Sequence, residues 1–132
     1  MTTLFSAASA VPVITKDARS SRVQLAGLWT LQIASAGMFL FVGTLKLAGG
    51  PDLVSLFDAI GIGQWFRYLT GTIEVVSAVL LLVPTLAFYG ALLLVPTMVG
   101  AVITHLFIVG GSPLPATLFL LATATIAWVR RP

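Results

Sequence analysis

The sequence predicts an all-α membrane protein, an antiparallel bundle of four transmembrane helices with a short amphipathic helix between the first and second spans. Of its 132 residues, 58% are hydrophobic and only 8% are charged, whereas soluble domains carry about 25% charged residues. The mean hydropathy is +1.08. Apolar runs of membrane-spanning length cover residues 26–47, 65–83, 86–109 and 114–129.

Composition also excludes several classes of function. The chain contains no cysteine, which rules out disulfides, thiol redox relays and cysteine-ligated metal sites. Its net charge of +3 is dispersed, without a run of lysine and arginine, so we expect no nucleic-acid partner.

Residues 1–25 form the expected N-terminal tail, and residues 26–132 form the expected transmembrane domain. Lys16, Arg19 and Arg22 stand just before the first apolar run, where they can contact anionic lipid head groups. We therefore predict a cytoplasmic tail.

The first span, 26–47, begins near Trp29, which suits the membrane interface. Its small residues at 34–37 allow a neighbouring helix to approach closely. Lys46 lies about one turn from its far end, so its side chain either extends outward to the interface or turns into the bundle.

The segment 51–60 is the predicted short amphipathic helix. Pro51 suits a first helical position, and Gly61 and Gly63 supply a stop. The apolar residues fall at i, i+3, i+4 and i+7: Leu53, Leu56, Phe57 and Ile60. Such a helix is expected to lie on the outer membrane surface.

The second span, 65–83, carries Arg67, Thr70 and Glu74 on one helical face. An ionised carboxylate inside a bilayer costs about 2.5–3.5 kcal/mol on insertion scales. Glu74 therefore needs a partner, a proton or a function.

The third span, 86–109, contains Pro96, which should kink it. Thr104 and His105, the only histidine, lie on one stripe of this helix. The last span, 114–129, ends at two arginines.

Topology brings the ionisable residues of the spans to one side of the membrane. The expected location is the cell (plasma or inner) membrane. The basic residues outside the first and last spans place both termini on its cytoplasmic side. Depths below the outer membrane boundary follow from a rise of about 1.5 Å per residue. Arg67 lies at that boundary and Lys46 lies about 3–5 Å below it. His105 lies about 6–8 Å below it and Glu74 about 13 Å below it. We expect Lys46, Glu74 and His105 to share a polar pocket that opens outward.

A family resemblance supports this arrangement. It rests on Gly43 with Lys46-Leu47, on Gly71 with Glu74 followed by Leu80-Leu81-Leu82-Val83-Pro84, and on Met98, Ala101 and His105. From about Leu25 onward the chain resembles the DoxX and DoxX-like family of small four-helix membrane proteins. The resemblance implies a helix bundle. It implies no single reaction, because the family is named for a subunit linked to a thiosulfate:quinone oxidoreductase, whereas relatives have been tied to oxidative-stress complexes or act as membrane chaperones.

The first functional hypothesis is a redox- or quinone-associated accessory subunit. Lys46, Glu74 and His105 would bind a polar head group and pass protons as candidate catalytic residues. Arg67, Thr70 and Thr104 are the candidate ligand-binding residues beside them. An equal alternative is a purely structural network that joins three helices.

Three other classes stay open. The chain fits a non-enzymatic assembly or interaction subunit, with other membrane subunits or its own copies as partners. It also fits a small transporter, or an acid–base enzyme acting on a lipophilic molecule with Glu74 as base or nucleophile. We expect no metal site; a quinone is the cofactor to consider, whereas a lone His105 without a second ligand argues against haem.

Overall fold

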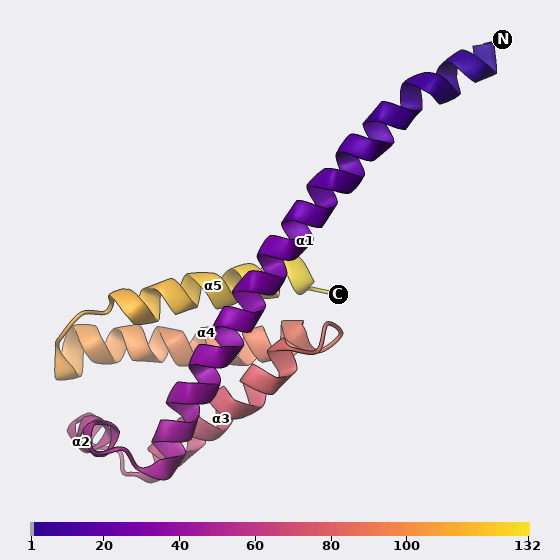
Figure 1. Cartoon of the computed structure of the whole chain (residues 1–132). Coiled ribbons are helices and arrows are strands. Elements are labelled where there is room, and N and C mark those ends of the chain that lie inside the picture. Colours follow the sequence, from indigo (N-terminus) through magenta and orange to yellow (C-terminus); the bar gives the residue numbers. More distant parts are fainter. Residues whose placement is uncertain (1) are drawn as a thin grey trace. The chain divides into compact units, whose positions relative to one another are not determined.

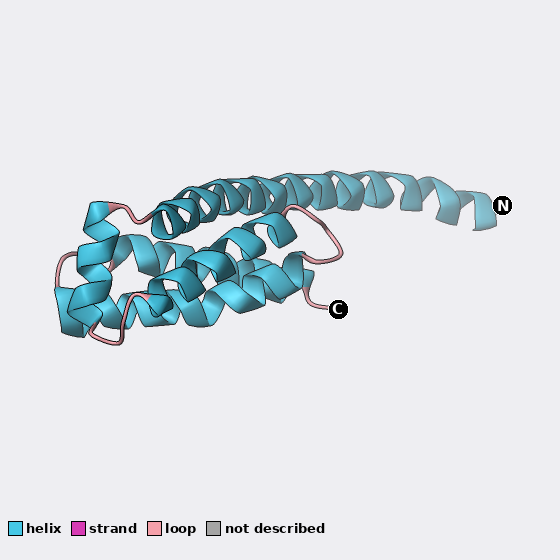
Figure 2. Ribbon diagram, turned by 90° about the horizontal axis from the view of Figure 1, so that it is seen from below, coloured by secondary structure: helices cyan, strands magenta, loops and turns pink. Residues whose placement is uncertain are grey.

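The computed structural model describes residues 2–132, with side chains described from residue 19 onward. It confirms the all-α class, because the described residues form helices and no strand (Figure 2). The helices are α1 (Thr2–Ala48), α2 (Pro51–Ile60), α3 (Trp65–Leu81), α4 (Ala87–Thr104) with a π-helical turn at His105–Val109, and α5 (Leu114–Arg130) (Figure 1).

Helix α1 contributes to two compact units, one up to Thr30 and one from Leu31 to Pro132. The helix covers residues 2–25, to which the sequence assigned a tail of no stated structure. The second unit contains the end of α1 and all of α2–α5, and the candidate site lies within it.

Helix α3, helix α4 with its π-helical turn, and helix α5 lie on the apolar runs 65–83, 86–109 and 114–129, whereas α1 begins at Thr2, well before the run 26–47. Two stretches, Arg19–Ala48 and Ala87–Val109, are long and apolar enough to cross a membrane. Leu114–Arg130 is a shorter apolar helix, and α3 has 17 residues, which is at the lower end of the spanning range.

The second unit is apolar outside and partly polar inside. Large apolar side chains such as Ile33, Phe107 and Leu121 are exposed. Six polar or charged residues are buried instead: Gln32, Ser35, Arg67, Glu74, Ser77 and Thr123. This distribution suits a protein whose exterior faces lipid, since polar groups in a bilayer turn toward the bundle interior.

Glycines bring α1 and α3 into close contact. A Cβ added at Gly43 would lie 2.9 Å from Val75 Cγ2 and 3.1 Å from Glu74 Cβ, and one added at Gly71 would lie 3.0 Å from Lys46 Cβ. Only residues without side chains permit this approach. The contact places Lys46 directly opposite Glu74.

Helices α4 and α5 complete the second unit. The turn after α3 returns the chain so that α4 packs against it, and Gly90 accommodates the backbone carbonyl of Ser77, 2.9 Å from where its own Cβ would stand. Helix α5 packs along α4 and reaches α1 through an edge-to-face contact of Phe39 with Phe119, whose centroids are 5.4 Å apart.

Helix α2 lies beside the π-helical turn. It begins at Pro51 and ends at Gly61, whose φ of 86° gives a left-handed cap that bonds back to the Phe57 carbonyl. Phe57 is buried and stacks edge-to-face on Phe66 at 5.8 Å. The apolar side of α2 therefore faces the bundle.

Candidate functional site

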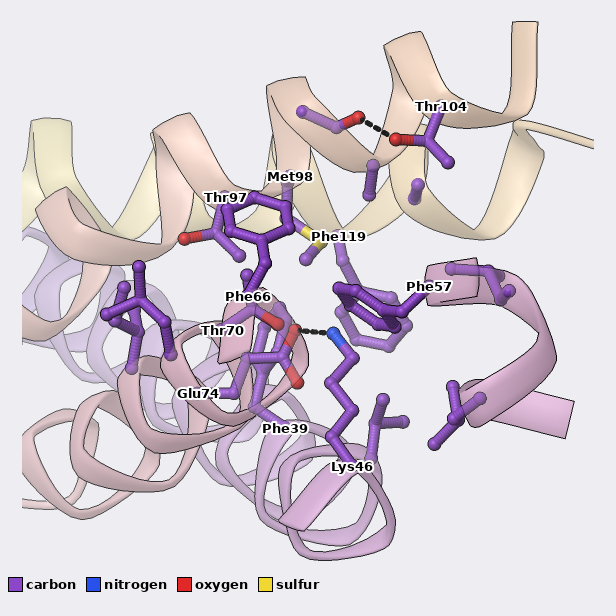
Figure 3. Close-up of a pocket in the computed structure, with 18 of the residues that line it drawn as sticks. Phe39, Lys46, Phe57, Phe66, Thr70, Glu74, Thr97, Met98, Thr104 and Phe119 are labelled. Atoms are coloured by element: carbon purple, nitrogen blue, oxygen red, sulfur yellow. Dashed lines mark hydrogen bonds and ion pairs between the residues drawn. The ribbon is translucent and has the colours of Figure 1, made fainter. Parts of the chain in front are cut away.

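A cavity of about 610 Å³ lies among the end of α1 and helices α2–α5 (Figure 3). Its wall is mostly apolar, with aromatic side chains and Met98 prominent: Phe39, Phe57, Phe66 and Phe119. Six lining side chains are polar: Lys46, Thr70, Glu74, Thr97, Thr104 and His105. The cavity has the size and character of a site for a small lipophilic molecule.

An ion pair between Lys46 and Glu74 forms the polar part of the wall, with Nζ and Oε1 2.5 Å apart (Figure 3). The side chain of Glu74 is 1% exposed and that of Lys46 is 13% exposed. The second carboxylate oxygen, Glu74 Oε2, is buried and has no partner among the described residues. Burying a charged acceptor without a partner is costly, so this atom is where a ligand's donor would gain most.

The ammonium of Lys46 also lies over an aromatic ring, 5.8 Å from the centroid of Phe57. This is at the outer limit of a cation–π contact. It connects the ion pair to α2, which covers one side of the cavity.

His105 lines the same cavity at the first residue of the π-helical turn, a feature frequent at functional sites. Its Nδ1 lies 3.1 Å from the carbonyl oxygen of Gly110. Because a carbonyl oxygen only accepts, Nδ1 is the donor in this contact, which corresponds to the tautomer whose Nε2 is an acceptor. His105 has no hydrogen bond to Lys46 or Glu74 within the described part of the chain.

Thr70 and Thr104 also line the cavity, as does Thr97, which the sequence did not single out as a ligand residue. Thr104 Oγ1 donates to the Gly100 carbonyl at 2.8 Å, as Figure 3 shows. These threonines line the cavity from α3 and α4.

Arg67 does not line the cavity. It is 4% exposed, donates through Nη1 to the carbonyl of Lys46 and through Nε to Gln64 Oε1 at 2.6 Å. Gln64 Nε2 in turn donates to Asp58 Oδ1 at 2.7 Å and to the Val54 carbonyl at 3.1 Å. This network, the Arg67–Gln64 clamp, joins the end of α1, helix α2 and the start of α3.

A second group of polar residues lies elsewhere in the bundle. The sequence analysis did not predict that its members contact one another. Gln32 is fully buried, and its Nε2 donates to the Leu81 carbonyl at 2.7 Å. Arg130 Nε donates to Gln32 Oε1 at 2.9 Å. A glutamine within an apolar span and an arginine at the end of the last span were the available signals.

Among the described residues, no group of three or more His, Cys, Asp or Glu is placed to hold a metal ion.

Comparison with known proteins identifies the family of the chain. Neither the comparison with curated proteins nor that with solved structures gives a match. The model of the DoxX-like family matches residues 30–129. This range runs from the part of α1 that carries Lys46 through α2, α3 and α4 to the next-to-last residue of α5. The chain therefore belongs to the DoxX-like family, and its apolar helices agree with a membrane protein.

Proposed function

We propose that α1, α3, α4 and α5 cross the cell membrane as an antiparallel bundle, with both termini in the cytoplasm and α2 at the outer surface. The apolar exterior of the second unit supports this arrangement. Basic residues before the first span and after the last, such as Arg22 and Arg131, favour cytoplasmic termini.

The absence of cysteine from the sequence makes topology directly testable. The single-cysteine variant Ser112→Cys, between α4 and α5, should react with a membrane-impermeant maleimide in intact cells. The variant Thr85→Cys, between α3 and α4, should react only after permeabilisation. Equal labelling of both positions in intact cells would contradict four crossings.

We further propose that the cavity binds a lipophilic small molecule with a compact polar head group, of the quinone type, and that the protein acts as a redox-associated accessory subunit. One observation carries this proposal: the Lys46–Glu74 pair stands in the wall of an apolar cavity with Glu74 Oε2 buried and without a partner. A purely structural pair has no need of a cavity beside it.

The residues divide naturally between head group and tail. Lys46 donates to an oxygen of the head group, and Glu74 Oε2 accepts from it. His105, whose Nδ1 is engaged by the Gly110 carbonyl, offers Nε2 as a hydrogen-bond and proton acceptor for the head group. The aromatic wall formed by Phe39, Phe57 and their neighbours holds the apolar part of the ligand.

Lipid extraction and mass spectrometry of the purified protein test this proposal. A lipophilic molecule with a polar head group should co-purify at up to one per chain. The variant Ala101→Phe fills the cavity, because Ala101 lines it, and should release that molecule. Val99→Phe on the same helix is the matched control, because Val99 is 41% exposed on the outside. Equal retention by both variants would contradict a ligand in this cavity.

A further inference from the structure

The three threonine hydroxyls in the cavity wall have already used their protons. Thr70 donates to the Arg67 carbonyl at 3.2 Å, Thr97 to the Leu93 carbonyl at 2.9 Å and Thr104 to the Gly100 carbonyl at 2.8 Å. A hydroxyl has one donor and two lone pairs. These threonines can therefore offer a ligand acceptors only.

The remaining polar side chains, one excepted, are acceptors as well. A carboxylate that pairs with an ammonium accepts at both oxygens, and Glu74 Oε2 has no partner among the described residues. His105 donates a hydrogen bond from Nδ1 to the Gly110 carbonyl, and in this tautomer Nε2 is an acceptor. Lys46 is the exception, and it directs one of its three N–H groups to Glu74.

We propose that the ligand of this cavity is a hydrogen-bond donor, a phenol or dihydroxy aromatic head group, and that the site binds a hydroquinone in preference to the dione of the same ring. This inference rests on the proposed function and narrows it. A dione offers only lone pairs to a wall that is itself rich in lone pairs. A hydroquinone can donate to Glu74 Oε2 and still accept from Lys46.

Affinities of three matched probes for the purified protein test the preference: a decyl-substituted hydroquinone, its dione and its dimethyl ether. The ether has the shape of the hydroquinone without its donors. The hydroquinone is measured without oxygen, so that its ring stays reduced. Since the lost hydrogen bond is to a charged acceptor, we expect the hydroquinone to bind roughly 10- to 100-fold tighter than either analogue.

Two variants assign the preference to the acceptors. Glu74→Gln replaces a carboxylate oxygen with an amide that also donates, so the ratio of hydroquinone to dione affinity should fall by roughly tenfold. Thr97→Val keeps the shape and leaves the ion pair intact. It should lower the affinity for the hydroquinone by roughly two- to fivefold and leave the affinity for the dione unchanged. If Glu74→Gln does not fold, Thr97→Val still tests the assignment.

The outcomes separate this inference from the proposed function. Binding of the dione or of the ether as tightly as the hydroquinone would overturn the donor requirement while leaving the cavity as a lipophilic site. Failure of all three probes to bind would overturn the proposed function itself. A hydroquinone preference that both variants leave unchanged would refute the assignment to these acceptors.

Discussion

Removing one member of the Lys46–Glu74 pair should destabilise the protein far more than removing both. With Nζ and Oε1 2.5 Å apart, Coulomb attraction at an effective dielectric constant of 20 is about 6–7 kcal/mol. Desolvation of two nearly buried groups offsets much of this gain. Lys46→Met or Glu74→Gln alone leaves a buried charge or donor unpaired and should cost about 3–5 kcal/mol.

The double variant Lys46→Met/Glu74→Gln removes both charges and should lie within about 1–2 kcal/mol of the parent protein. Equilibrium unfolding of the detergent-solubilised protein, followed by circular dichroism, measures all four members of this cycle. Asp52→Asn changes an exposed charge in the first turn of α2 and serves as the control, with an expected loss of about 0.3–1 kcal/mol.

The cycle has a clear contrary result. If the double variant loses as much stability as the two single variants together, Lys46 and Glu74 do not interact. If each single variant loses no more than the Asp52→Asn control, the pair is not buried as the structure places it.

Three further tests, the first with its own control variant, probe the helix packing and the buried hydrogen bonds of the second unit. Gly43→Ala should cost about 1–3 kcal/mol, because its Cβ would stand 2.9 Å from a neighbouring side chain; Gly37→Ala, with open space around its Cβ, should be neutral or stabilising in the same unfolding assay. Gln64→Leu breaks the Arg67–Gln64 clamp, so the amide hydrogens of α2 should exchange faster than in the parent protein, while those of α5 exchange at the parent rate. An unchanged exchange rate in α2 would show that the clamp does not hold this helix. Gln32→Leu leaves a hydrogen-bonded partner of Arg130 missing and should cost about 1–3 kcal/mol, and unchanged stability would contradict the buried contact.

The sequence was sufficient to predict α2–α5 and the end of α1, whereas the helix over residues 2–25 was not predicted. Spacing of apolar residues, Pro51 and Gly61 predicted the short helix 51–60, and the structure places it at those residues. The predicted apolar runs agree with the later helices to within a few residues because glycine and proline mark their ends. The crossing of a membrane by four helices stays a prediction.

Contacts between distant residues were harder to predict. The cost of a buried acid was enough to suggest a partner for Glu74, and Lys46 is the residue it pairs with. The bond between Gln32 and Arg130 joins residues 98 positions apart, and no local pattern specifies it. The part of Arg67 in the clamp was hidden for the same reason, since its partners become neighbours only when α1, α2 and α3 meet.

The most direct test of the proposed site is to find where the tail of a bound lipophilic phenol lies. A lipophilic phenol that carries a photoreactive group on its tail should be cross-linked to the purified protein and its adducts mapped by mass spectrometry. We expect adducts on cavity residues such as Met98 and Phe57, which should be lost in Ala101→Phe and retained in Val99→Phe. Adducts confined to the lipid-facing surface, unchanged by Ala101→Phe, would contradict it.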